Sequence, residues 1–254
     1  MIAVALLFCS VFSHNAYALS KPSEKPRSSY NLGTAGVLKG RCVAVNLFCN
    51  TPGNSWTELE KSERIKQLNK ACTFIEKQAR TFGNDTEFVY NDSEKGMWAE
   101  VRFCSEITSG EDFEKALDGK IKCWSKYLIP YEKLYREYEA DSVFIIVHFK
   151  ELGNCYAISY DGEDIPEEAL VIYRDSTEAE LAHEILHLYG AHDFYRGAEY
   201  SDDVVKYLSG VYPSEIMLRP SWKIENNMIS SLTAYHVGWL HDSEDADRYP
   251  QLGR

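Results

Sequence analysis

The segment His183–Asp193, HEILHLYGAHD, constrains this chain more than any other stretch. Its first two histidines stand four positions apart, and on an α-helix such positions lie one turn apart on the same face. Both imidazoles can therefore reach one metal ion, and Glu184 projects from the flank, where it can accept a proton from an activated water. The opposite face is apolar, as a helix anchored in a core requires (Leu181, Ile185 and Leu188). The pattern predicts a zinc-hydrolase site; the competing interpretation is a chance match with two surface histidines.

Gly190 comes where this helix must stop if the chain is to turn toward a third ligand. Glycine adopts the left-handed conformation that ends a helix at no steric cost. His192 and Asp193 come next, and both residue types bind zinc. A glutamate further along, Glu199 or Glu215, is another possible ligand, as in HExxH enzymes that take one from a downstream element. If Asp193 binds the metal, we expect His192 to face substrate or to support the ligands from outside.

The N-terminus predicts an exported protein. Residues 2–12 form an apolar run too short to span a bilayer, and the A-x-A cleavage pattern ends at Ala18, although no basic residue precedes Lys21. We expect a signal peptide at residues 1–18, a flexible lead-in at 19–38, and a secreted, extracytoplasmic location; the alternative is a buried N-terminal helix. A net charge of −12 argues against a nucleic-acid surface, which needs clustered Lys and Arg. No stable membrane insertion is expected.

The cysteines leave two interpretations open. Six come after the predicted cleavage site: Cys42, Cys49, Cys72, Cys104, Cys123 and Cys155. An even number in an exported chain favours up to three disulfide bonds. Several stand at apolar positions of predicted strands and helices, so buried free thiols are the alternative. No pair has CxxC spacing, which argues against a structural zinc ribbon.

The order of predicted elements favours an α/β fold of the α+β kind. Strands are expected at 42–48, 86–90, 142–149, 155–160 and 170–173, with a further strand within 98–107. Besides the HExxH helix, helices are expected from a Ser55–Glu58 capping box to Gly83, at 113–138 with a kink or restart at Pro130, and at 202–208 and 233–239. This pattern predicts a mixed twisted sheet with helices packed on it. His148, inside a continuously apolar strand, is expected to be a core residue rather than a ligand.

These features together resemble the metzincin clan of zinc metallopeptidases. Its signature is HExxHxxGxx followed by His or Asp, and then a methionine turn beneath the metal. The matching residues, in the version with aspartate as third ligand, are His183, Glu184, His187, Gly190 and Asp193. Residues 214–217, SEIM, are similar to the methionine turn, and the later LTAYHVGW resembles exported bacterial members of the clan. The resemblance covers residues 40–245.

The resemblance implies a single catalytic domain at residues 39–254, with an upper subdomain at 39–190 and a smaller, mostly irregular or helical lower subdomain at 191–254. It selects Asp193 as third zinc ligand and makes Met217 an apolar floor under the ligands; the alternative for Met217 is a core methionine. No tyrosine stands two residues after that methionine, so the tyrosine that assists the transition state in some families is not carried over. The strand at 170–173 would offer a sheet edge to an extended substrate.

We therefore expect a secreted, monomeric, zinc-dependent endopeptidase acting on proteins or peptides. Glu184 would take the proton of the attacking water and pass it to the leaving amine, so no nucleophilic Ser or Cys is needed. One alternative is a zinc-containing binding protein that has lost turnover, against which the intact Glu184 argues. The other is an interaction domain with structural zinc, closed by both His192 and Asp193.

Overall fold

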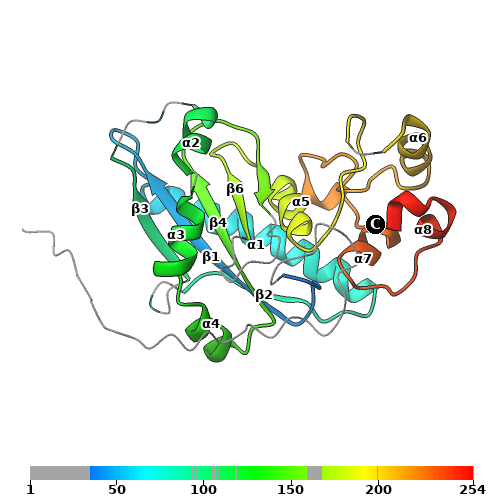
Figure 1. Ribbon diagram of the computed structural model, residues 1–254, viewed down its shortest axis with the longest axis horizontal. Helices are drawn as coiled ribbons and strands as arrows, with labels where there is room; N and C mark the ends of the chain where they lie inside the picture. Colours follow the sequence, from blue (N-terminus) through cyan, green and yellow to red (C-terminus); the bar gives the residue numbers. More distant parts are fainter. Residues whose placement is uncertain are drawn as a thin grey trace, which may run out of the picture.

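The computed structural model describes residues 35–253, apart from positions 93, 95–96, 105–106, 108, 118, 159–167 and 199. In this part of the chain, a six-stranded sheet and eight α-helices form a mixed α/β fold, which confirms the predicted class (Figure 1). The predicted signal peptide, residues 1–18, lies outside the described residues. None of the described helices combines the length and apolar composition needed to cross a bilayer.

The sheet is parallel except at one edge. Its strands are β1 (Arg41–Asn50), β2 (Glu87–Val89), β3 (Trp98–Arg102), β4 (Ser142–Phe149), β5 (Tyr156–Ile158) and β6 (Ala169–Ile172). They are ordered β2-β1-β4-β6-β5, and β3 pairs with β1 next to β2. β5 is antiparallel to β6, which pairs with β4 on its other side. The expectation that the strand at 170–173 offers a free edge is therefore wrong, because β5 occupies that edge.

Helices cover both faces of the sheet, and this explains why its central strands are apolar throughout. Successive side chains of a strand point to opposite faces. Cys42 and Ala44 thus pack on the side of α1 and α5, and Val43 and Val45 on the side of α2, α3 and α4. The bounds of these helices are Glu58–Thr81 (α1), Gly110–Leu117 (α2), Lys120–Tyr127 (α3), Tyr131–Tyr138 (α4) and Glu178–Leu188 (α5).

The position of His148 within β4 confirms its prediction as a core residue. Its ring is fully buried and stacks on Phe48 with 4.3 Å between ring centroids. Nε2 lies 2.8 Å from Oδ1 of Asn46 on the neighbouring strand. Because the amide nitrogen of Asn46 donates to the carbonyl of Tyr90, its Oδ1 is the acceptor and His148 donates.

Two predicted helix boundaries were wrong. α1 begins after Thr57, whose side chain forms the capping box with Glu60, and not at the predicted box of Ser55 and Glu58. The reason is that Trp56 is held outside the helix: its indole is buried, and its backbone N donates to Asn50 Oδ1. The helix expected over 113–138 is also interrupted once more, before α3 at Gly119, which has a φ of 65°. The restart at Pro130 is confirmed.

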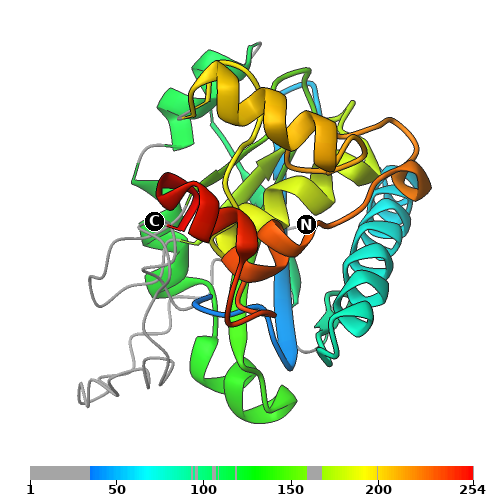
Figure 2. The same ribbon diagram turned by 90° about the vertical axis from the view of Figure 1, so that its right-hand side faces the viewer.

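The segment after α5 contains only short helices (Figure 2). Its buried side chains belong to the same hydrophobic core as one face of the sheet. It contains α6 (Asp202–Val211), η1 (Ile224–Asn226), α7 (Ser231–His236), α8 (Glu244–Arg248) and η2 (Pro250–Gly253). Leu38 is fully buried against it: its N donates to Val237 O, and its O accepts from Trp239 Nε1. Ala35 is buried as well, so the predicted flexible lead-in of residues 19–38 extends too far into the folded chain.

The six cysteines that follow the predicted cleavage site are all free thiols in the structure. Three of them are core residues (Cys42, Cys49 and Cys72), Cys155 is half-buried, and Cys104 and Cys123 are exposed. The buried three fit the alternative of core thiols, and burial raises the pKa of Cys42 to about 11. Disulfide bonds, like export itself, stay a prediction.

Candidate metal centre

The start of α5 is fixed by its own sequence. Thr177, the residue before the helix, accepts from Glu180 N, and the Glu180 carboxylate accepts from Thr177 N in return. Two backbone N–H groups that the first turn leaves unpaired are thus satisfied. Eight of the eleven residues of α5 are buried, and the helix packs against α1 and the sheet. A buried, capped helix is a rigid support for the side chains that it carries.

The end of α5 turns the chain back toward the helix. Gly190 has a φ of 95°, its N donates to His187 O, and Ala191 N donates to Leu186 O. These two bonds form a Schellman motif, which requires the left-handed conformation that glycine adopts freely. The carbonyl of Ala191 then accepts from Nδ1 of His187, at 2.8 Å. The predicted stop at Gly190 is therefore present, and it returns the next residues to the histidine face.

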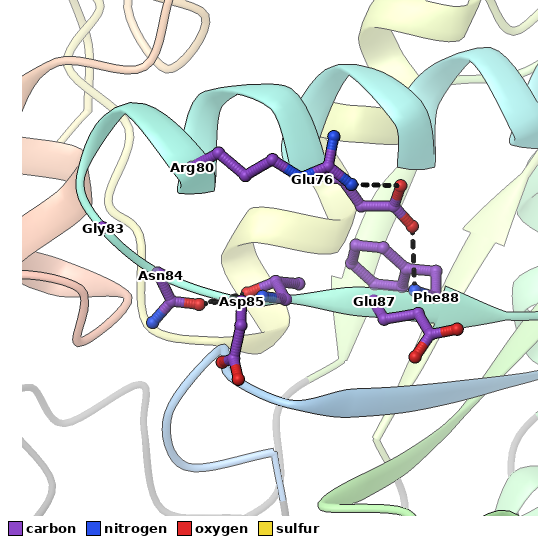
Figure 3. A pocket seen from close by; sticks show the side chains of 8 residues that line it. Glu76, Arg80, Gly83, Asn84, Asp85, Glu87 and Phe88 are labelled. Atoms are coloured by element: carbon purple, nitrogen blue, oxygen red, sulfur yellow. Dashed lines mark hydrogen bonds and ion pairs between the residues drawn. The ribbon is translucent and has the colours of Figure 1, made fainter.

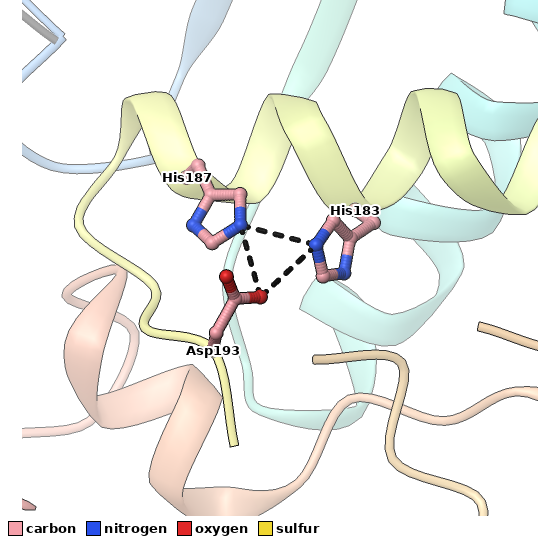
Figure 4. Close-up of side chains that lie close together, drawn as sticks. All are labelled: His183, His187 and Asp193. Carbon is pink, nitrogen blue, oxygen red and sulfur yellow. Dashed lines mark hydrogen bonds and ion pairs between the residues drawn. The ribbon is translucent and has the colours of Figure 1, made fainter. Parts of the chain in front are cut away.

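Three of the predicted ligands converge (Figure 4). The Nε2 atoms of His183 and His187 lie 3.1 Å apart, and each lies 3.2 Å from Oδ1 of Asp193. Among the described residues, these three form the one group of His, Cys, Asp and Glu side chains with ligand atoms close enough to share a metal ion. The sequence predicted all three.

The protons of this triangle support metal binding. Nδ1 of His183 faces the carbonyl of Ile216 at 3.1 Å, and Nδ1 of His187 faces that of Ala191. A carbonyl oxygen only accepts, so each Nδ1 carries the proton and each neutral Nε2 offers a lone pair. Oδ1 of Asp193 is buried without a hydrogen-bond partner among the described residues. Bonds of about 2.0–2.1 Å in a tetrahedral zinc shell place neighbouring ligand atoms about 3.3 Å apart, so the donor set fits zinc.

The charges of the centre are strongly coupled. Burial lowers the pKa of His187, but the neighbouring carboxylates of Asp193 and Glu184 outweigh it and the net shift is upward. The pKa of Asp193 is lowered: burial would raise it, and the contacts with His183 and His187 reverse the sign. Both shifts arise because the Asp193 carboxylate lies in contact with the two imidazoles.

Glu184 is buried beside the triangle. Burial raises the pKa of its carboxyl, and the two histidines oppose that shift electrostatically. Glu184 is not in the ligand group. An acid with a raised pKa, next to the ligands but outside them, suits the transfer of a proton near neutral pH.

The alternative third ligands that the structure describes, His192 and Glu215, lie elsewhere. The ring of His192 packs between Tyr200, to whose hydroxyl its Nδ1 is hydrogen bonded, and His236 at 4.6 Å between centroids. Glu215 is buried in a separate hydrogen-bond network. Glu199 lies outside the described residues. Of the candidates that the structure describes, only Asp193 joins the histidines.

The predicted methionine turn contacts the centre through its backbone. Ile216 O receives the His183 ring, and Met217 O accepts from Phe194 N, the residue after Asp193, at 2.9 Å. The Met217 side chain is fully buried in the common core. The roles of the Ile216 and Ala191 carbonyls were missed by sequence reasoning, because a backbone acceptor leaves no mark on the identity of its residue.

Two hollows on the surface of the described residues lie away from this centre. One is formed by the C-terminal end of α1 and the start of β2, between positions 76 and 88 (Figure 3). In it, Glu76 accepts from Phe88 N and pairs with Arg80, so its carboxylate is already engaged. A second hollow lies between α1 and β3, beside Lys61 and Trp98. Neither contains a predicted site residue.

Comparisons with known proteins add no family. No protein-family model and no curated protein matches the chain. One solved chain, described as "Structure of a chaperone-substrate complex", aligns with a TM-score of 0.33 and 12% sequence identity over 63% of this chain. This chain covers 25% of the length of that chain. A likeness of this size carries no argument about fold or function, so the candidate metal centre stands on its own geometry.

Proposed function

We propose that the protein is a zinc-dependent endopeptidase of the metzincin type, secreted and acting on protein or peptide substrates. The observation that carries the proposal is the triangle of His183, His187 and Asp193, with the buried Glu184 beside it. Three protein ligands leave the fourth position of a tetrahedral zinc open, which is characteristic of catalytic rather than structural sites. The resemblance in the signature, the mixed sheet before the metal helix, and the turn at Met217 support the same proposal.

The chain supplies the proton transfers of peptide hydrolysis. A bound zinc ion would polarise both the attacking water and the scissile carbonyl. The Glu184 carboxylate accepts the proton of the water as it attacks, and then delivers it to the nitrogen of the leaving amine. Its raised pKa makes the protonated form accessible between the two transfers. The carbonyls of Ile216 and Ala191 accept from Nδ1 of His183 and His187, which orients each ring with its Nε2 toward the metal position.

The edge strand β5 is the strand available to an extended peptide. It is antiparallel and terminal in the sheet, and it packs beside α5. A peptide added to this edge would gain main-chain hydrogen bonds along a line that passes the metal helix. This replaces β6, the strand that sequence reasoning selected.

Structural zinc is not favoured by this geometry. A closed shell needs a fourth protein ligand. The adjacent candidate, His192, is held by Tyr200 and His236 rather than in the ligand group. A binding protein without turnover would have no use for the buried, non-ligand Glu184, whose burial raises its pKa.

The test is peptide cleavage by the zinc-loaded protein. A complex peptide library would be incubated with the wild type, with Glu184→Gln, and with a chelator, and cleavages would be mapped by mass spectrometry. Glu63→Gln, an exposed glutamate on α1, is the matched control. We expect wild type and control to cleave alike, and a loss of roughly 10²–10⁴-fold in Glu184→Gln. A folded, zinc-loaded wild type that cleaves nothing would contradict the proposal.

A further inference from the structure

Glu215 is a buried carboxylate that the proposed reaction does not use. It is the first residue of the turn at residues 215–217, and its side chain points to the N-terminal end of α7, with 1% of its surface exposed. Oε1 accepts from Met217 N and from Thr233 Oγ1, both at 3.1 Å. Oε2 accepts from Ser230 N. One side chain therefore joins two segments that stand 15 residues apart in the chain.

The backbone reinforces this junction. Ile216 N donates to Met228 O at 3.0 Å, and Met228 N donates to Ser214 O at 2.8 Å. Burying a carboxylate is unfavourable unless donors satisfy it. Burial raises the pKa of Glu215, and the hydrogen bonds to its oxygens oppose that shift. The carboxylate stays in place because its donors come from both segments, and it thereby fixes one segment against the other.

The two residues after Glu215 face the metal centre. The carbonyl of Ile216 accepts from Nδ1 of His183 at 3.1 Å, and the carbonyl of Met217 accepts from Phe194 N at 2.9 Å. The first contact sets the tautomer and rotation of one predicted ligand. The second holds the backbone directly after Asp193. A tilt of this turn would move both acceptors at once.

We propose that Glu215 is a positioning residue for the metal centre: its carboxylate locks the turn at 215–217, so that two consecutive carbonyls orient His183 and the segment of Asp193. The inference rests on the proposed function, because it assigns Glu215 a role toward the zinc ligands. Groups that orient metal ligands from outside the shell typically change metal affinity by roughly 10–100-fold when they are removed.

The experiment compares zinc affinity with stability in two variants. Glu215→Gln keeps the volume of the side chain but turns one acceptor oxygen into an NH₂ group, which must face either Ser230 N–H or Met217 N–H. Asp245→Asn is the matched control: Asp245 is 4% exposed, lies in the same part of the fold, and accepts from the hydroxyls of Tyr207 and Tyr212.

Zinc affinity would be measured by competition with a chromogenic chelator, and the thermal unfolding midpoint on the metal-free proteins. Both variants should unfold at a lower temperature than the wild type. Only Glu215→Gln should bind zinc more weakly, by roughly 10–100-fold. In that variant, the Nδ1 proton of His183 should also exchange faster with solvent in NMR spectra than in Asp245→Asn.

The outcomes separate the two proposals. Equal zinc affinity in Glu215→Gln and Asp245→Asn would reduce Glu215 to a structural residue and overturn the inference, as would a wild type that binds no zinc. A wild type that binds zinc but cleaves no peptide would overturn the peptidase proposal and leave the positioning role standing. If Glu215→Gln does not fold, Thr233→Val replaces it. That variant removes one donor and should weaken zinc binding by a smaller factor, and unchanged affinity would again overturn the inference.

Discussion

Helices α1 and α5 begin and end alike. Both start after a threonine that forms a capping box with a glutamate at the third helical position. Both end in a Schellman motif at a glycine with positive φ, 74° at Gly83 and 95° at Gly190. They pack side by side, and Arg64 of α1 donates to the carbonyl of Ser176, just before α5, at 3.0 Å. By their boundaries alone, the two helices are equivalent.

They differ in burial and in the path of the chain after the glycine. α1 buries eight of its 24 residues, whereas α5 buries eight of 11, including His183 and Glu184. After Gly83 the chain continues into β2 at the edge of the sheet. After Gly190 it returns to its own helix through Ala191 O and Asp193. The candidate metal site on α5 is complete only because the segment after Gly190 returns Asp193 to the two histidines.

Removal of that third ligand should have the largest effect. If three ligands share the roughly 10–16 kcal/mol typical of structural zinc sites, Asp193→Ala costs about 4 kcal/mol, or roughly 1000-fold in zinc affinity. His192→Ala should change zinc affinity by only a few fold, because that ring packs on Tyr200 and His236. The zinc affinity of both variants would be measured by competition with a chelator. A larger loss in His192→Ala would assign the third ligand to His192.

Low pH should destabilise the fold through His236, which lies in the segment after α5. His236 is 1% exposed and packs on His192, and burial lowers its pKa to about 4. Its neutral form stabilises the fold above the unfolded-state pKa of about 6.5, and that contribution is lost as the pH falls through about 4. The loss amounts to about 3 kcal/mol. Urea unfolding of the metal-free protein at several pH values should show it, and the pH dependence should be weaker in His236→Gln. Parallel curves for the two proteins would contradict the assignment.

Most helix and strand boundaries could be predicted from the sequence, because the signals that set them are local. The strand at 142–149, the stop at Gly83 and the stop at Gly190 each depend on neighbouring residues, and all three are confirmed. The start of α1 was misplaced by a local ambiguity. Both Ser55 and Thr57 have a glutamate three residues on, and the burial of Trp56 decides between them.

The support of the metal ligands and the order of the strands could not be predicted, because they depend on contacts that sequence spacing does not encode. The motif named His183, His187 and Asp193, but not the carbonyl acceptors that orient the two rings. The order of the strands was equally hidden, since β5 and β6 are short and nothing in their residues says which one lies at the edge. The strand order and the contact of His183 with Ile216 O join residues far apart in the chain, whereas the contact of His187 with Ala191 O is local but uses a backbone acceptor.

The two terminal glycines allow the comparison to be tested directly. Gly83→Ala and Gly190→Ala each force an alanine into the left-handed conformation, which costs about 1–2 kcal/mol of folding free energy. At Gly83 a Cβ atom would meet nothing within 4 Å, so the effect there is conformational alone. Both variants should lose similar stability in urea unfolding, but only Gly190→Ala should also lose zinc affinity. Equal zinc affinity would show that the turn after α5 does not place Asp193.

The caps should give the smallest effects, and the most even ones. Thr57→Ala and Thr177→Ala each remove a hydroxyl that accepts from the third backbone N–H of its helix. A lost cap of this kind costs about 1 kcal/mol. The caps lie at the ends remote from Gly83 and Gly190, so zinc affinity should be unchanged in both variants when it is measured on the folded protein. Weaker zinc binding in Thr177→Ala would mean that the helix start also sets the geometry of His183, and that α1 and α5 differ along their whole length rather than only behind the glycine.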